Sequence, residues 1–168
     1  MGIIYREPRK SDLDGMLAFI NELAGEDTYI MTGRQTRPKE KKWLDGQLKA
    51  MRKRNAAMAV AEGGGRIVGV CGINRRSEYP RARHAATLGV SVLKAFRGKG
   101  IGEGLMRRAM ALAKKRLGAK LLTLSVFANN PIAPRLYRKM GFRQFGRCPG
   151  MFSFRGKYVD EIYMYCRL

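Results

Sequence analysis

The chain contains 168 residues, the usual size of one domain, and this length is enough to bury a core without disulfides or a structural metal. Hydrophobic residues make up 45% of the chain, which excludes general disorder. The formal charge of +21 is uneven, since residues 1–50 carry a net charge of +1 and residues 51–168 carry +20. Such a basic body attracts nucleic acid, anionic membranes or the phosphates of a nucleotide cofactor, and charge alone does not choose among these polyanions.

The first elements along the chain are a strand and an amphipathic helix. Residues 3–5 predict a short apolar strand, and Ser11 followed by Asp14 fits the capping pattern at the start of a helix. This helix continues to Gly25, because apolar residues recur at helical spacing. Its apolar positions are Leu13, Met16, Leu17, Ile20 and Leu23.

A second helix and a hairpin follow. Pro38 can open the helix, since a proline in the first turn sacrifices no hydrogen bond, and the helix ends near Arg54. We expect its inner face to consist of Trp43, Leu44, Leu48 and Met51. The apolar runs 56–61 and 67–73 flank a glycine-rich turn and predict a β-hairpin.

The rest of the chain alternates strands with helices and ends in another hairpin. The predicted elements are a strand over 86–93, a helix over 102–117, a strand over 121–127, a short helix over 131–140 and paired strands over 142–154 and 158–166. The total is about seven strands and four helices. Early hairpins followed by strand-helix-strand units indicate an α/β (α+β) fold with a mixed sheet, rather than a doubly wound parallel sheet.

Other features of the sequence bear on compartment and metals. No apolar stretch reaches the roughly 18 to 20 residues of a membrane span, and the first residues lack the apolar middle of a signal peptide. Cys71, Cys148 and Cys166 are odd in number and widely separated, so neither a disulfide framework nor a zinc site is indicated. We expect one domain over residues 1–168, cytoplasmic, with buried reduced thiols, no bound metal and no membrane partner.

Four glycines alternate where the strand over 86–93 gives way to a helix, at Gly98, Gly100, Gly102 and Gly104. They let backbone N–H groups approach a phosphate at the positive end of the helix, so a pyrophosphate is the natural ligand. A Rossmann fingerprint does not fit, because its third glycine would fall at Glu103 or Leu105 and no acidic residue follows at the required distance. The phosphate loop of nucleotide triphosphatases does not fit either, because Lys99 is followed by glycine instead of Ser or Thr.

Two motifs together resemble the GNAT superfamily of N-acetyltransferases. Arg97-x-x-Gly100-x-Gly102, after the strand residues Gly89-Val90-Ser91-Val92, is similar to the coenzyme A pyrophosphate motif of that family. The second signature of the family is similar to residues 126–142, which include Asn130, Ala133, Leu136, Tyr137 and Gly141. The resemblance covers most of the chain and implies a GNAT-like fold, acetyl-CoA as cofactor, and splayed central strands that hold it.

The resemblance implies a set of cofactor-binding residues. Backbone N–H groups would hold the pyrophosphate, with added positive charge from two of the side chains, at Arg97, Gly98, Lys99, Gly100, Ile101 and Gly102. The preceding strand would bulge, so that main-chain groups at Val92 and Leu93 pair with the pantetheine arm and the thioester.

The short helix over 131–140 would contribute Asn130, Ala133 and Tyr137 from one face. Asn130 fits a contact with the cofactor arm and an N-cap equally well. Pro134 removes a backbone donor, so the first turn of this helix is expected to be irregular.

For catalysis, the resemblance assigns Tyr137 as the general acid that protonates the departing thiolate, and a phenol is a suitable donor. The alternative is that Tyr137 is only a core aromatic. The general base is less defined, because many relatives carry Glu on the cofactor strand where this chain has Thr87. His84 has a suitable intrinsic pKa, although a lone histidine is more often structural.

The acceptor is the least constrained part of the prediction. Glu22, Glu26 and Asp27, at the end of the first helix, could recruit a cationic amine or could be a solvated helix end. We predict direct acetyl transfer from acetyl-CoA to a primary amine, with a small amine or an amino-acid-like molecule as acceptor.

Several alternatives to this prediction stay open. Protein N-terminal or lysine acetylation would suit a basic docking surface, and a coenzyme A sensor would explain Thr87. Nucleic acid is not expected as the primary partner, because the aromatic residues fall at core periods instead of among surface arginines. The sequence leaves a homodimer open.

Overall fold

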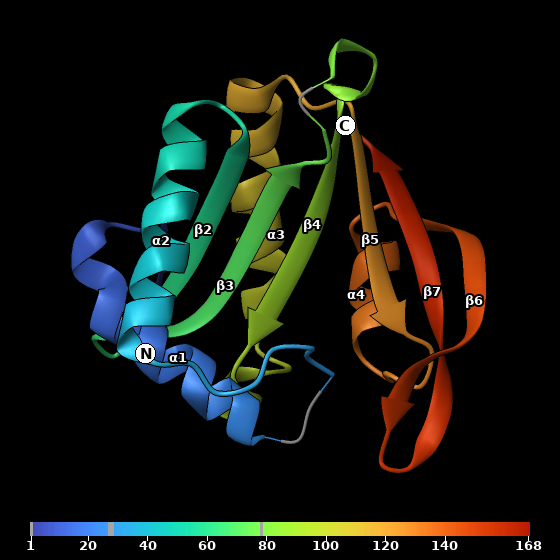
Figure 1. The fold of residues 1–168 in the computed structure, drawn as a ribbon, viewed down its shortest axis with the longest axis horizontal. Helices are drawn as coiled ribbons and strands as arrows, with labels where there is room; N and C mark the ends of the chain where they lie inside the picture. The colour runs from blue at the N-terminus through green and yellow to red at the C-terminus, as the bar shows by residue number, and fades with distance from the viewer. Residues whose placement is uncertain (1, 27–28, 78) are drawn as a thin grey trace.

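The computed structural model describes residues 2–26, 29–77 and 79–168. Within this part of the chain, seven strands form one mixed sheet in the order β1-β2-β3-β4-β5-β7-β6 (Figure 1). The strands are β1 (Ile3–Arg6), β2 (Ala56–Gly63), β3 (Arg66–Arg75), β4 (Ala85–Val92), β5 (Leu121–Phe127), β6 (Arg143–Phe154) and β7 (Lys157–Arg167). Neighbouring strands are antiparallel except for the parallel pair β4 and β5.

Four α-helices accompany the sheet in the described residues: α1 (Leu13–Gly25), α2 (Arg37–Arg52), α3 (Ile101–Leu112) and α4 (Ala133–Lys139). The predicted mixed sheet with about seven strands and four helices is therefore confirmed. A π-helical segment, Ala113–Leu117, extends α3 to Gly118, whose φ of +62° ends the helix as glycine was expected to do. None of the helices in these ranges combines the length and apolarity needed to cross a membrane.

Two helical layers cover opposite faces of the sheet. On β2, Ala57, Ala59 and Ala61 pack into a core with α3, whereas Met58 and Val60 pack into a second core with α1. This alternation follows from the two-residue period of a strand. Figure 1 shows α1 and α2 on the near face of the sheet and α3 behind it. The small alanines allow α3 to lie close to the sheet.

The sheet opens between its two parallel strands. β4 pairs with β5 only where Ala85–Thr87 lies against Leu121–Thr123. Beyond Thr87 the two strands diverge towards their carboxyl ends (Figure 1). The expected splay is therefore present. The expected bulge is wrong, because the β3–β4 register continues from Ala86 to Val92 without a shift.

Several local predictions need correction. Asp12, not Ser11, precedes α1, and its carboxylate accepts a hydrogen bond from the Arg9 amide at 2.7 Å, while Asp14 is exposed and paired with Arg37. Trp43 is not a core residue of α2, since 42% of it is exposed.

The cysteines and α4 also differ in part from expectation. Cys71 and Cys166 are buried free thiols, but Cys148 is only half-buried. The last helix begins at Ala133, two residues later than predicted. Pro134 therefore occupies the first turn, where its missing N–H costs no hydrogen bond.

Candidate active site

The glycine turn places free backbone donors in front of α3. Gly98 and Gly100 have φ values of +74° and +76°, which L side chains rarely adopt. A Cβ added at either glycine would meet no atom within 4 Å, so this side of the turn is open. The N–H groups in the first turn of α3 have no partner within the helix. The turn can therefore surround an anion with main-chain donors.

The other two glycines of the alternating run have different functions. A Cβ on Gly104 would lie 2.3 Å from the ring of Tyr5, so this glycine lets α3 pack against β1. A Cβ on Gly102 would lie 3.0 Å from the side chain of Leu136 on α4. The contact with Tyr5 explains the glycine at position 104, which lies beyond the predicted cofactor-binding residues 97–102.

A groove of about 690 Å³ runs from this turn between the splayed strands. We call it the β4–β5 groove. Its walls are residues 88–92 of β4, residues 125–127 of β5, the glycine turn and one side of α4. Splaying removes the interstrand hydrogen bonds here, so strand backbone faces the groove and can pair with an extended ligand.

Tyr137 closes the inner side of the β4–β5 groove. Its side chain is 6% exposed and lies 6.1 Å, between ring centroids, from Phe142. Burial raises the pKa of the Tyr137 phenol above its ordinary value, so the hydroxyl stays protonated at neutral pH. None of the described side chains forms a hydrogen bond with this hydroxyl. The ring is thus a core aromatic, and the residue also lines the groove.

An aromatic cluster covers the other side of the groove. Tyr29, which follows α1, stacks on Phe154 at 4.9 Å and tilts against Phe127 at 5.6 Å between ring centroids. Phe127 in turn stacks on Phe152 at 3.8 Å. The Tyr29 hydroxyl donates a hydrogen bond to the Asn129 carbonyl at 3.1 Å. The segment after α1 is thereby attached across the groove to the C-terminal strands.

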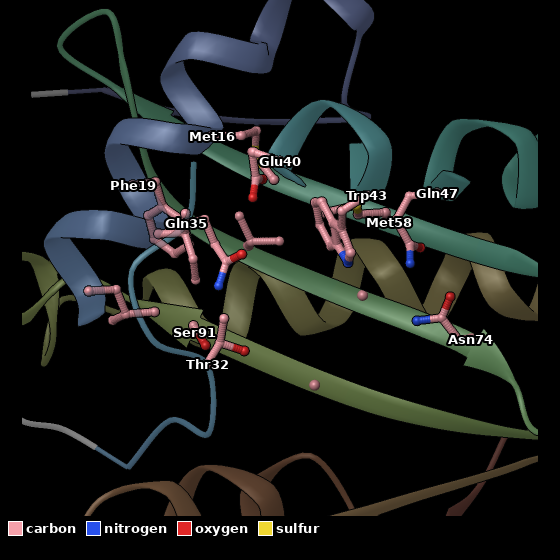
Figure 2. A pocket seen from close by; sticks show the side chains of 15 residues that line it. Met16, Phe19, Thr32, Gln35, Glu40, Trp43, Gln47, Met58, Asn74 and Ser91 are labelled. Atoms are coloured by element: carbon pink, nitrogen blue, oxygen red, sulfur yellow. The ribbon is translucent and has the colours of Figure 1, made fainter. Parts of the chain in front are cut away.

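A second hollow of about 360 Å³ adjoins the groove on the side of α1 and α2. We call it the α1–α2 hollow. Figure 2 shows Glu40, Trp43 and Gln47 side by side on the sheet-facing side of α2, next to Met16 and Phe19 of α1. The hollow and the groove share the lining residues Ile20, Leu23, Thr32, Gly89 and Ser91. The two spaces therefore adjoin along α1 and β4.

An ion pair holds the end of α1 against the glycine turn. The Glu26 carboxylate lies 2.5 Å from Nη2 of Arg97 and accepts a second hydrogen bond from the Lys94 amide at 2.7 Å. Nε of Arg97 also donates to the Val92 carbonyl at 2.9 Å. The Glu26 side chain is only 11% exposed, so the pair is partly shielded from solvent. Arg97 thus fixes the strand end, the turn and α1 relative to one another.

Comparison with known proteins agrees with this geometry. The family model described as Acetyltransferase (GNAT) family matches residues 17–142. The chain belongs to this GNAT family. Its fold is similar to that of yncA from Salmonella typhimurium, solved with its cofactor acetyl-CoA, with a TM-score of 0.86, 20% identity, and coverage of 100% of this chain and 95% of that one.

Two N-acetyltransferases match over shorter segments. The L-amino acid N-acetyltransferase AaaT of Escherichia coli is 31% identical over 87 residues, which are 52% of this chain and 54% of that protein. The N-alpha-acetyltransferase RimI of Mycobacterium tuberculosis is 34% identical over 87 residues, which are 51% of each protein. The chain thus spans about half the length of these curated relatives.

The GNAT cofactor positions carried over from the motif do not all reach the groove. Val92, Arg97, Gly98, Gly100, Ile101 and Gly102 line it, as do Asn130, Ala133 and Tyr137. Leu93 does not, because its N–H donates to the Val68 carbonyl at 3.0 Å and its side chain is completely buried. Lys99 lies outside as well, with Nζ bonded to the Ala95 carbonyl at 3.0 Å.

Asn130 caps the start of α4. Its Oδ1 accepts hydrogen bonds from the amides of Ile132 and Ala133, each at 3.0 Å. Asn130 nevertheless lines the groove, so its amide NH₂ group can still contact a ligand. Both interpretations of this residue are therefore compatible with the geometry.

The structure separates His84 from the rest of the GNAT site. His84 is exposed and precedes β4, whereas the glycine turn follows the other end of that strand. Leu88, the nearest residue of β4 that lines the groove, is four residues further along the chain, which corresponds to about 13 Å. His84 therefore lies too far from the groove to take a proton directly from an amine in it. Thr87 is exposed on the paired part of β4 and lines neither the groove nor the hollow.

The acidic residues predicted to bind the acceptor have different environments in the structure. Glu22 pairs with Arg66 at the surface and lines neither the β4–β5 groove nor the α1–α2 hollow. Glu26 supports the turn through Arg97 and so has a different partner from the expected amine. Asp27 lies outside the described residues.

The sequence interpretation missed Glu40 and Tyr29. Glu40 is a lone acidic residue between lysines at the start of α2, where a solvated position is the ordinary expectation. The residue is buried all the same, since only 5% of it is exposed. The available signal was the spacing on α2, because Glu40 shares one helix face with Trp43, Leu44 and Gln47.

Proposed function

We propose that this GNAT chain transfers an acetyl group from acetyl-CoA directly to a small primary amine. The continuity of the β4–β5 groove with the α1–α2 hollow carries the proposal. Gly89 and Ser91 of β4 line both spaces, so a ligand lying along the groove and an acceptor in the hollow meet beside this strand. Holding two reactants side by side is the main requirement for direct transfer.

The groove fits the chemistry of acetyl-CoA, which supplies the acetyl group as an activated thioester. The open side of Gly98 and Gly100 would take the pyrophosphate on backbone N–H groups at the start of α3. The unpaired edge of β4 would hold the extended arm. The net charge of +20 over residues 51–168 favours an anionic ligand. The acetyl-CoA in yncA, which has the same fold, supports this choice.

Tyr137 is the proposed general acid. It lines the groove beside β4, and burial keeps its phenol protonated by raising its pKa. The neutral amine attacks the thioester carbonyl and loses a proton to solvent, the C–S bond breaks, and the departing thiolate takes its proton from the protonated phenol of Tyr137. Packing against Phe142 fixes the ring, so the hydroxyl stays directed at the same place.

Calorimetric titration with acetyl-CoA, followed by a coenzyme A release assay with a panel of amines, tests the function. We expect a dissociation constant in the range of about 1 μM to 1 mM and release that depends on the amine. The absence of binding would refute the proposal. Binding without release for any amine, amino acid or peptide would instead support a coenzyme A sensor.

A second candidate is acetylation of protein N-termini, which the similarity to the N-alpha-acetyltransferase RimI supports. The same panel separates the two functions when it contains short peptides with free N-termini. If peptides react at least about tenfold more efficiently than small amines, a difference of about 1.4 kcal/mol, the peptide function is the correct one.

A further inference from the structure

Glu40 is an isolated buried carboxylate in the α1–α2 hollow. Three acidic residues are buried in the described part of the chain: Asp12, Glu40 and Glu161. Asp12 pairs with Arg6 at 2.8 Å, and Glu161 accepts a hydrogen bond from the Tyr163 hydroxyl at 2.6 Å. Glu40 has no such partner among the described side chains. Among the described residues, the only fully buried side-chain nitrogen or oxygen without a hydrogen bond is Nε of Arg75, so the Glu40 carboxylate faces the open hollow, where a ligand can supply its partner.

None of the described residues that line the hollow around Glu40 carries a positive charge. The described lining residues of the hollow are apolar or neutral apart from Glu40 itself, although the chain holds 34 Lys and Arg. The neutral polar groups are Thr32, Gln35, Gln47, Asn74 and Ser91, and apolar walls come from residues such as Phe19 and Met58. Burial also raises the pKa of the Glu40 carboxyl, as expected for an acid that lacks a counter-ion.

We propose that Glu40 binds the ammonium group of the acceptor and that the α1–α2 hollow selects cationic amines without a carboxylate. An ammonium supplies the missing partner of Glu40 and removes the cost of burying its charge. A carboxylate on the ligand would find no described cation in the hollow and would lie near Glu40, where like charges repel. Apolar parts of the amine would contact Phe19, Trp43 and Met58. The acetylation of such amines rests on the proposed function, whereas their binding does not.

Trp43 allows the binding to be measured without turnover. It is the only tryptophan of the chain, and it lines the hollow next to Glu40 (Figure 2). Its emission therefore reports on occupancy of this hollow. We would titrate the coenzyme A-loaded protein with 2-phenylethylamine and with phenylalanine, which differ by one carboxylate. Glu40→Gln removes the charge at constant size, and Asp45→Asn removes an exposed charge on the same helix as the matched control.

We expect saturable binding of 2-phenylethylamine that weakens at least about tenfold in Glu40→Gln and stays unchanged in Asp45→Asn. Phenylalanine should bind at least about tenfold more weakly than the amine to the unsubstituted protein, and Glu40→Gln should narrow this gap. Equal affinity in Glu40→Gln, equal affinity for the two ligands, or no saturable change in emission would overturn the inference. Thermal unfolding of each variant confirms that the comparison is between folded proteins.

A coenzyme A release assay on the same protein variants, supplied with acetyl-CoA in place of coenzyme A, separates the two proposals. If Glu40→Gln weakens amine binding but no sample releases coenzyme A, the proposed acetyl transfer fails and the amine site stands. If coenzyme A is released and Glu40→Gln behaves like Asp45→Asn in both KM and affinity, the amine site fails and the transfer stands.

Discussion

The β4–β5 groove and the α1–α2 hollow adjoin, but they offer ligands different kinds of contact. At the glycine turn, where the groove would bind an anion, the contacts are main-chain N–H donors. Their positions are set by the backbone conformations of Gly98 and Gly100. The hollow offers mostly side-chain contacts. Glu40 is the only charged residue among its described lining residues, and Trp43 forms part of its wall. A main-chain site depends on backbone conformation, whereas a side-chain site changes its ligand with single substitutions. Acceptor choice can therefore change in this fold without disturbing the cofactor site.

The largest expected effect concerns Tyr137, which lines the β4–β5 groove. Tyr137→Phe should lower kcat about 100-fold or more, because it removes the proton donor but retains the packed ring. The affinity for acetyl-CoA should stay unchanged in calorimetry. Tyr163→Phe, which removes a hydroxyl bonded to Glu161 outside the groove, is the matched control.

An equal loss of kcat in both tyrosine variants would contradict the role of Tyr137. The pH profile adds a check on the same hydroxyl. Because burial raises its pKa, Tyr137 keeps its proton above the ordinary phenol value of about 10. The unsubstituted enzyme should therefore show no alkaline loss of kcat from this group at or below about pH 10.

The second prediction tests whether the anion end of the groove depends on backbone conformation. Gly100→Ala should weaken acetyl-CoA binding about tenfold, because a left-handed conformation costs a non-glycine residue about 1 to 2 kcal/mol. Gly118→Ala is the control, since Gly118 has a φ of +62° and open space but lies away from the groove. Both variants should lose similar stability in thermal unfolding, and only Gly100→Ala should lose affinity.

The third prediction concerns the support of the turn. Glu26→Gln should raise the KM for acetyl-CoA about three- to tenfold, because it weakens the pairing with Arg97 that holds the turn against α1. The control is Glu22, which lies on α1 and forms a more exposed ion pair with Arg66 of β3. Glu22→Gln breaks that pair and should leave the KM for acetyl-CoA unchanged. If the two variants behave alike, the turn does not need this support.

The two regions also differ in how much of them could be predicted from sequence. The glycine turn is a local feature, since residues 93–100 between β4 and α3 specify its backbone. The splayed sheet was predicted from the family motif. Even there, the role of Gly104 depends on Tyr5 of β1, which is distant in sequence. Local spacing shows that a glycine is needed but does not show which neighbour requires it.

The α1–α2 hollow could not be predicted, because its lining comes from two helices and three strands. Glu40 is acidic among basic neighbours, and only the packing of α2 against the sheet reveals that it is buried and unpaired. His84 illustrates the opposite error: its chemistry is suitable, but the direction of β4 places it at the wrong end. A titratable side chain therefore identifies a site only when the fold also brings it to the ligand.

The smallest expected effect concerns Lys99, and it tests the contrast between main-chain and side-chain binding most directly. Nζ of Lys99 donates to the Ala95 carbonyl and lies 5.6 Å from the centroid of the Phe96 ring, outside the groove. Lys99→Ala should therefore weaken acetyl-CoA binding only about two- to threefold, as expected for an exposed charge. This difference should vanish in high salt, because salt screens exposed charges. A loss of about tenfold or more that persists in salt would mean that a side chain, and not the backbone of the turn, holds the phosphates.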